Sequence, residues 1–306
     1  MRFAVESWSP DYGAPIGEDA LVESTAEVNA WVEADASAWA PRGVPARTSL
    51  LDDLLFVDGV RRIEAHVWIT DGDDVVHQGI CASYAAGGVH CNAAARVIEP
   101  QVRHGLFSPV ADAPPISTRH VHFTAHVAAD DDQDLSLLLQ KKMGELEAQV
   151  AGAVGAVGLI VVDGPLKFGQ AQPGKVGYIK THASAYGPPL VRDIVTRLGV
   201  GERTPILLLG GKENRYSWYF RLPCALRHGW AGVVRLETTA DQPLADVVNL
   251  ADRLSVTLPR FASREEKDPR APQNLYPIGG LERELRRRLG DPMLIMRSLR
   301  EAAAKT

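Results

Sequence analysis

Two aspartates that each follow a run of apolar residues are the side chains of this sequence best suited to chemistry. Asp58 follows Leu-Leu-Phe-Val and Asp163 follows Leu-Ile-Val-Val, and a glycine comes directly after each aspartate. Such runs indicate buried strands, and Asp-Gly after them predicts that each strand ends in a turn. Two carboxylates that lie close together need a cation, because like charges repel at short range. The pair therefore predicts a hard-metal site, although either Asp-Gly alone is also ordinary turn chemistry.

The composition is that of an ordinary globular protein, with 306 residues of which 45% are hydrophobic and 23% are charged. No apolar stretch approaches the roughly 20 residues that span a bilayer, so we expect a cytoplasmic protein without membrane contact. The three cysteines lack the spacing of a disulfide framework or a zinc site. Because the net charge is −5, any contact with nucleic acid must be local.

The chain divides into an N-terminal arm or cap at 1–50, with a short helix expected around 22–40, and a core domain at 51–306. After the first Asp-Gly, alternating residues predict strands at 62–69 and 75–82, which with the first apolar run form a three-stranded antiparallel meander. A further strand is predicted at 120–127. The C-terminal region is predicted to be helical, with a solvated arginine-rich face and an apolar stripe of Leu281, Leu285, Leu289 and the run 293–296 that could serve a dimer.

Between the strand at 120–127 and the second Asp-Gly, apolar residues recur at helical spacing over 135–150. This predicted helix carries Glu145 and Glu147. Glu147 lies at the border of the apolar face, whereas Glu145 points towards Lys141 and Lys142, so Glu147 is favoured as a third carboxylate. Three strands, a helix and a fourth strand are the order of RNase H-like nucleases, an α/β fold with a mixed sheet flanked by helices. Three carboxylates open to water would suit Mn²⁺ or Mg²⁺, which can activate water against a phosphodiester.

Further segments make the order recognisable. The second Asp-Gly continues as Asp163-Gly164-Pro165-Leu166, the next strand has Gly177 followed by Lys180, and an aromatic-arginine element stands at 218–221. Taken together over 51–289, the sequence resembles the NurA family of DNA end-processing nucleases. That family has an apolar-Asp-Gly strand, a helix glutamate, an Asp-Gly-x-Leu strand and a Gly-x-x-Lys strand.

The resemblance implies an RNase H-like, Mn²⁺-dependent deoxyribonuclease that acts on DNA ends and single strands in end resection, repair or defence. It also implies a homodimer and a hexameric HerA-type ATPase as partner. The resemblance assigns roles by position. The metal ligands would be Asp58, Glu147 and Asp163. Lys180 would be a catalytic lysine near the scissile phosphate, Tyr219 would lie at the rim of the site, and Arg221 would contact the DNA backbone.

One departure concerns the last conserved segment, where the family often has a metal-binding histidine. Residues 272–282 contain none here, and Asn274, Glu282 or His182 are candidates to take its place. His182 is predicted to share a strand face with Lys180, so it is included among the candidate catalytic residues. The missing histidine leaves a second hypothesis open, a catalytically weak or inactive scaffold that docks on the ATPase and guides DNA. A third, an ATP-using RNase H-like protein, lacks the expected hydroxyl residues after Asp58.

Overall fold

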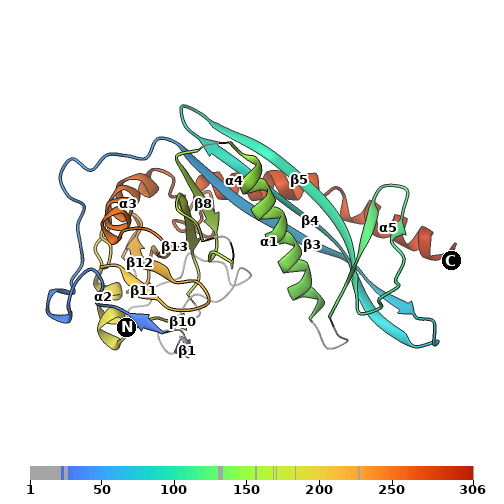
Figure 1. The fold of residues 1–306 in the computed structure, drawn as a ribbon. Coiled ribbons are helices and arrows are strands. Elements are labelled where there is room, and N and C mark those ends of the chain that lie inside the picture. The colour runs from blue at the N-terminus through green and yellow to red at the C-terminus, as the bar shows by residue number, and fades with distance from the viewer. Residues whose placement is uncertain are drawn as a thin grey trace, which may run out of the picture. The chain divides into compact units, whose positions relative to one another are not determined.

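The computed structural model describes residues 22–23, 27–129, 134–155, 157–167, 169, 171–182, 184–226 and 228–305. The chain forms two compact units (Figure 1). Unit 1 comprises Met1–Phe56, His90–Ala95 and Val157–Gly279, and unit 2 comprises Val57–Val89, Arg96–Ala156 and Gly280–Thr306. Both contain strands and helices, and the predicted α/β class with a mixed sheet flanked by helices is confirmed.

The sheet of unit 1 runs in the order β2-β11-β12-β13-β9-β8. Strands β8 and β9 are parallel, and each of the other neighbouring pairs is antiparallel. Their bounds are β2 Val28–Asn29, β8 Leu159–Asp163, β9 Lys175–Ile179, β11 Leu207–Leu209, β12 Arg215–Arg221 and β13 Val233–Thr239. Two short strands, β1 Val22–Glu23 and β10 Ser184–Ala185, form a separate parallel pair.

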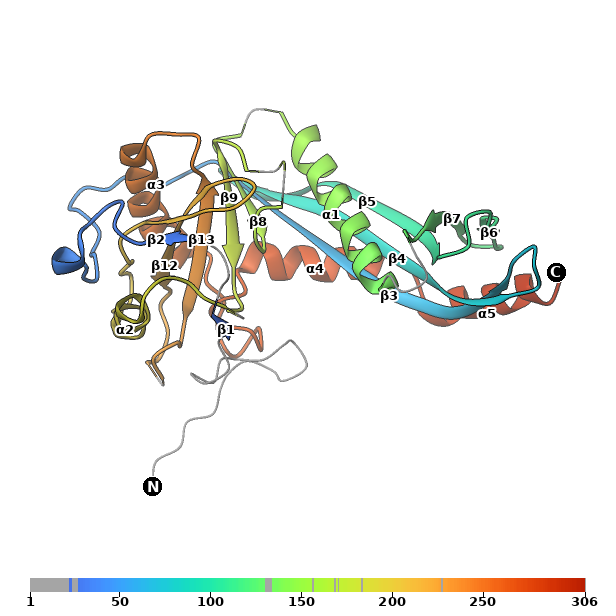
Figure 2. The same cartoon turned by 60° about the horizontal axis from the view of Figure 1, so that its bottom comes forward.

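Helices α2 (Pro189–Arg197) and α3 (Leu244–Thr257) lie on opposite sides of β12 and β13 (Figures 1 and 2). The side of α2 has a core that includes Tyr219 and Val233. Because side chains alternate along a strand, Trp218 faces the other side, and it is fully buried too. The central strands of unit 1 therefore carry buried side chains on both faces.

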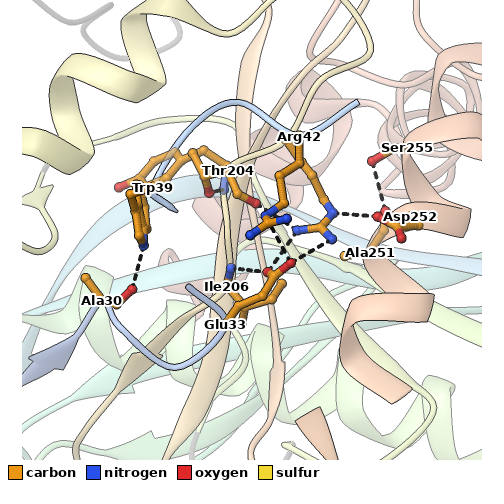
Figure 3. Close-up of polar contacts among 11 residues, drawn as sticks. Ala30, Glu33, Trp39, Arg42, Thr204, Ile206, Ala251, Asp252 and Ser255 are labelled. Carbon is orange, nitrogen blue, oxygen red and sulfur yellow. Dashed lines mark hydrogen bonds and ion pairs between the residues drawn. The ribbon is translucent and has the colours of Figure 1, made fainter. Parts of the chain in front are cut away.

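A buried ion network joins the segment before residue 50 to this sheet. The guanidinium of Arg203 bonds Glu33 through two nitrogens, at 3.0 and 3.1 Å, and Asp252 of α3 at 2.7 Å. Glu33 also accepts the Ile206 N–H at 2.6 Å (Figure 3). The described part of 22–40 contains short strands and a 3-10 helix at Ala36–Ala38, so the predicted helix there is wrong. This segment is held by side-chain ion pairs and by its pairing with β11.

Unit 2 is built on long strands in the order β3-β4-β5-β7-β6. Their bounds are β3 Leu54–Thr70, β4 Val76–Cys91, β5 Ala95–Ser108, β6 Ile116–Ser117 and β7 His122–Val127, and the first three residues of β3 belong to unit 1. Three helices follow along the chain: α1 Leu135–Ala153, α4 Tyr276–Arg288 and α5 Pro292–Ala303. Of α4, the part from Gly280 on belongs to unit 2.

Each face of the unit 2 sheet carries its own core. Ala82 of β4 packs with Leu138 and Leu139 of α1, which lies along the strands in Figure 2. Its neighbour Cys81 faces the other way and packs with α5 through a cluster that contains Ile295. In the part of the chain that the structure describes, no helix combines the length and the apolar character needed to cross a membrane.

Two expectations for unit 2 are corrected. Asp58 and Gly59 do not end a strand, because β3 runs through them without interruption. The predicted strands at 54–57 and 62–69 are therefore one strand. Most of the predicted apolar stripe is also not a free surface: Leu281, Leu285 and Leu289 are buried, whereas Met293 and Leu294 of α5 are exposed. Leu281 and Leu285 lie over Gly87, where an added Cβ would be 3.2 and 3.3 Å from them.

Candidate metal centre

Asp58 is a buried carboxylate in the interior of β3. It is 6% exposed, and its Oδ1 accepts the N–H of Gly59 at 2.7 Å. A carboxylate buried to this degree must be stabilised by hydrogen bonds and by positive charge, or it takes up a proton. Asp58 therefore has the burial expected of a metal ligand.

Gly59 makes room for a carboxylate of α1 on the face of β3 opposite to the Asp58 side chain, because consecutive residues of a strand point to opposite faces. A Cβ added at Gly59 would lie 2.5 Å from Glu147 Oε1 and 2.9 Å from Met143 Cγ, so these α1 side chains occupy the space above the glycine. Glu147 is 6% exposed. By contrast, Glu145 lies on the outer face of α1 and pairs with Lys142 at 2.8 Å. Of the two helix glutamates, Glu147 is the one that reaches β3, at Gly59 and on the face opposite to Asp58.

A third carboxylate of unit 2 comes from α4. One oxygen of Glu282 and one of Asp58 lie within 4.8 Å of each other. From the sequence, Glu282 was only one of three candidates to replace a histidine. The position of Glu282 in the sequence does not favour it over Asn274 or His182, because its approach to Asp58 depends on how α4 packs on the sheet.

In unit 1, Asp163 is the last residue of β8, as predicted. Gly164 follows with φ +94°, a conformation that favours glycine, and its N–H donates to Tyr178 O at 2.8 Å. Asp163 Oδ2 accepts a hydrogen bond from Lys180 Nζ at 2.6 Å. Asp163 Oδ1 is buried, and among the described residues it has no hydrogen-bond partner. One carboxylate oxygen is thus fixed while the other remains available to a ligand.

Lys180 is held from a second side by Asn274. Its Nζ donates to Asn274 Oδ1 at 3.1 Å, and Asn274 Nδ2 donates to Asp268 Oδ2 at 2.7 Å. Next to it, the hydroxyl of Tyr178 donates to Gln273 O at 2.6 Å. Burial, followed by the charge of Asp163, raises the pKa of Tyr178 well above its ordinary value, so this hydroxyl remains a donor. The segment at 273–274 is thereby tied to the strand that carries Lys180.

A residue that the sequence did not single out, Glu237, supports the loop after Asp163. Its Oε1 accepts the N–H of Leu166 at 2.8 Å and a bond from Arg215 at 2.9 Å, and its Oε2 accepts from Arg235 at 2.8 Å. Gly177 permits this approach, because a Cβ there would lie 3.0 Å from Glu237 Cγ. In the sequence, Gly177 of the Gly-x-x-Lys motif is the residue that indicates this close contact, and the motif alone does not reveal Glu237 as its partner.

Two predicted site residues belong to the hydrophobic core instead. His182 packs against the rings of Tyr219 and Trp230, with centroids 5.7 and 5.2 Å away, and its Nε2 lies 3.1 Å from Val233 O. Burial lowers the pKa of His182 to about 4, so it is neutral and donates to that carbonyl. Burial raises the pKa of Tyr219 to about 12. Neither side chain is open to a substrate, so the predicted catalytic roles of His182 and Tyr219 are corrected.

The predicted contact between Arg221 and DNA is corrected as well. Arg221 is 1% exposed, and its guanidinium donates to main-chain carbonyls of α2 and of the loop before β13. These acceptors are the carbonyl oxygens of Val195, Thr196, Gly229 and Ala231. A guanidinium committed in this way holds the fold together and is not available to a phosphate.

Of the predicted site residues, Asp58 and Glu147 both lie at β3 in unit 2 but on opposite faces of the strand, and Asp163 and Lys180 lie together in unit 1. No protein-family model matches the sequence, and no curated protein is similar enough to count as a match.

Proposed function

We propose that this protein is a divalent-metal-dependent DNA nuclease in which Asp58, Asp163 and Glu282 hold Mn²⁺ or Mg²⁺. The observation that carries the proposal lies in unit 2, where one carboxylate oxygen of Asp58 and one of Glu282 are within 4.8 Å of each other, and the resemblance adds Asp163 to this pair. Oxygen ligands are those that both ions prefer in proteins. Glu147, which the resemblance assigns to the metal, lies over Gly59 on the opposite face of β3 and is not part of this set.

The chemistry follows from the donor set. A bound metal ion would activate a water molecule for attack and stabilise the leaving oxygen of a phosphodiester. The carboxylates would hold the ion, and the loop fixed by Glu237 would keep Asp163 in place. Lys180 carries the positive charge closest to Asp163, and an ammonium in that position can offset charge that develops on a phosphate.

The resemblance to the NurA family extends this proposal. It suggests an RNase H-like fold, action on DNA ends and single strands, a homodimer, and a hexameric HerA-type ATPase that delivers the DNA. The element order that supports this part of the proposal is β3 to β7 before α1 and β8 after it.

Cleavage by purified protein tests the proposal. Linear DNA incubated with Mn²⁺ should be degraded, and Asp58→Asn, Asp163→Asn and Glu282→Gln should each abolish degradation while the proteins stay folded. Glu145→Gln is the matched control, because it removes a carboxylate of α1 that pairs with Lys142 on the outer face. Equal cleavage by wild type and Asp58→Asn would refute the proposal. Binding to the ATPase without any cleavage would favour the scaffold hypothesis.

A further inference from the structure

The amide of Asn274 connects a negative and a positive group inside unit 1. It is fully buried, its Oδ1 accepts from Lys180 Nζ, and its Nδ2 donates to Asp268 Oδ2. The ammonium can only donate and the carboxylate can only accept, which fixes the orientation of the amide. Both polar ends of Asn274 are therefore committed to protein partners.

The same chain of bonds continues to Asp163. Lys180 Nζ donates to Asp163 Oδ2 at 2.6 Å as well as to Asn274, and its side chain is only 10% exposed. Asp163 Oδ2 is thereby fixed, and the buried Oδ1 has no partner in the described part of the chain. The far end is fixed too, because Asp268 Oδ1 accepts the N–H of Arg270 at 2.8 Å.

We infer that Asn274 is a positioning residue, which acts through Lys180 to present Asp163 Oδ1 to the metal ion. Groups behind a metal ligand commonly set its orientation and thereby the metal affinity. Asn274 does not replace the missing histidine as a ligand, since its own oxygen is used by Lys180. The inference rests on the proposed role of Asp163 as a metal ligand.

The experiment measures the affinity of the full-length protein for Mn²⁺ by calorimetry, without DNA. Asn274→Leu removes both hydrogen bonds at similar volume and should weaken Mn²⁺ binding about tenfold. The double variant Asn274→Asp with Asp268→Asn exchanges the carboxylate and the amide. Its carboxylate at position 274 accepts from Lys180, and its amide at position 268 donates to that carboxylate and accepts from the Arg270 N–H. This variant keeps the net charge and should bind Mn²⁺ within about twofold of wild type.

A merely structural role for Asn274 would change the free energy of unfolding without changing the Mn²⁺ affinity of the folded protein. Unchanged affinity in folded Asn274→Leu would overturn the inference, and so would a double variant that binds no better than Asn274→Leu. If either result is found and the wild-type protein still cleaves DNA with Mn²⁺, the inference about Asn274 is wrong and the proposed function is still supported. If the wild-type protein binds no Mn²⁺, the proposed function is refuted, and the inference that rests on it is refuted with it.

Discussion

Gly59 of β3 lies directly beneath the carboxylate of Glu147, where an added Cβ would come within 2.5 Å of Oε1. The glycine that from sequence was expected to make a turn instead lies within a continuous strand. Its absent side chain lets α1 approach the strand closely enough to place Glu147 over the face of β3 that points away from Asp58. The role of the glycine in Asp-Gly therefore differs between the two copies, since Gly164 does adopt a turn conformation.

Replacing Gly59 by alanine should destabilise the protein by about 1–3 kcal/mol, because the new methyl group forces Glu147 and Met143 to move. Urea unfolding would measure the change. Gly72→Ala is the control, since a Cβ there meets no atom within 4 Å. If both variants are equally stable, the close packing of α1 on Gly59 is contradicted.

The buried histidine predicts a pH dependence. The pKa of His182 falls from 6.5 in the unfolded chain to about 4 in the folded protein. Below pH 6.5 the unfolded state therefore binds the additional proton, and the stability that neutral His182 contributes is lost progressively as pH falls from about 6.5 to about 4. The loss from this group is about 3 kcal/mol at most.

Denaturant unfolding at several pH values would reveal this loss, and His182→Gln should remove that part of the pH dependence. The control His120→Gln changes an exposed histidine and should leave the profile as in wild type. An identical slope between pH 6.5 and 4 for wild type and His182→Gln would show that His182 is not held neutral.

Arg221 should matter for stability and not for DNA binding. Arg221→Met leaves several buried carbonyl oxygens without a donor, at a cost of about 1–3 kcal/mol for each one that water does not reach. Thermal unfolding should show a large drop, while the folded variant should bind DNA as wild type does. Arg197→Met is the control, because that side chain is exposed and bonds a single carbonyl. A stable variant with weakened DNA binding would restore the predicted DNA contact.

The secondary-structure elements predicted correctly are those whose residue pattern depends only on neighbours in the sequence. The strand at 120–127 and the helix at 135–150 correspond to β7 and α1, because alternation and helical spacing report directly on one apolar face. Asp163 at the end of β8 followed from an apolar run and a glycine. The interruption assigned after Asp58 was wrong because a glycine inside a strand and a glycine in a turn look alike in sequence.

Site residues were harder to predict where tertiary packing decides their surroundings. Tyr219 and Arg221 lie on β12 and are enclosed because α2 covers the side of the sheet to which they point. His182 also resembled a site residue because it follows Lys180 closely in sequence, yet its ring packs on Trp230. Glu282 and Glu237 were not preferred because their contacts join segments far apart in the chain.

A crystal structure of the protein soaked in Mn²⁺, with anomalous diffraction recorded at the manganese edge, tests the central claim most directly. We predict one anomalous peak or more, coordinated by oxygens of Asp58, Asp163 and Glu282, with Lys180 and Asn274 outside the ligand set. Asp58→Asn crystals soaked in the same way provide the control and should show a weakened peak. Manganese bound elsewhere, or no peak at these carboxylates in the wild type, would contradict the proposed metal centre.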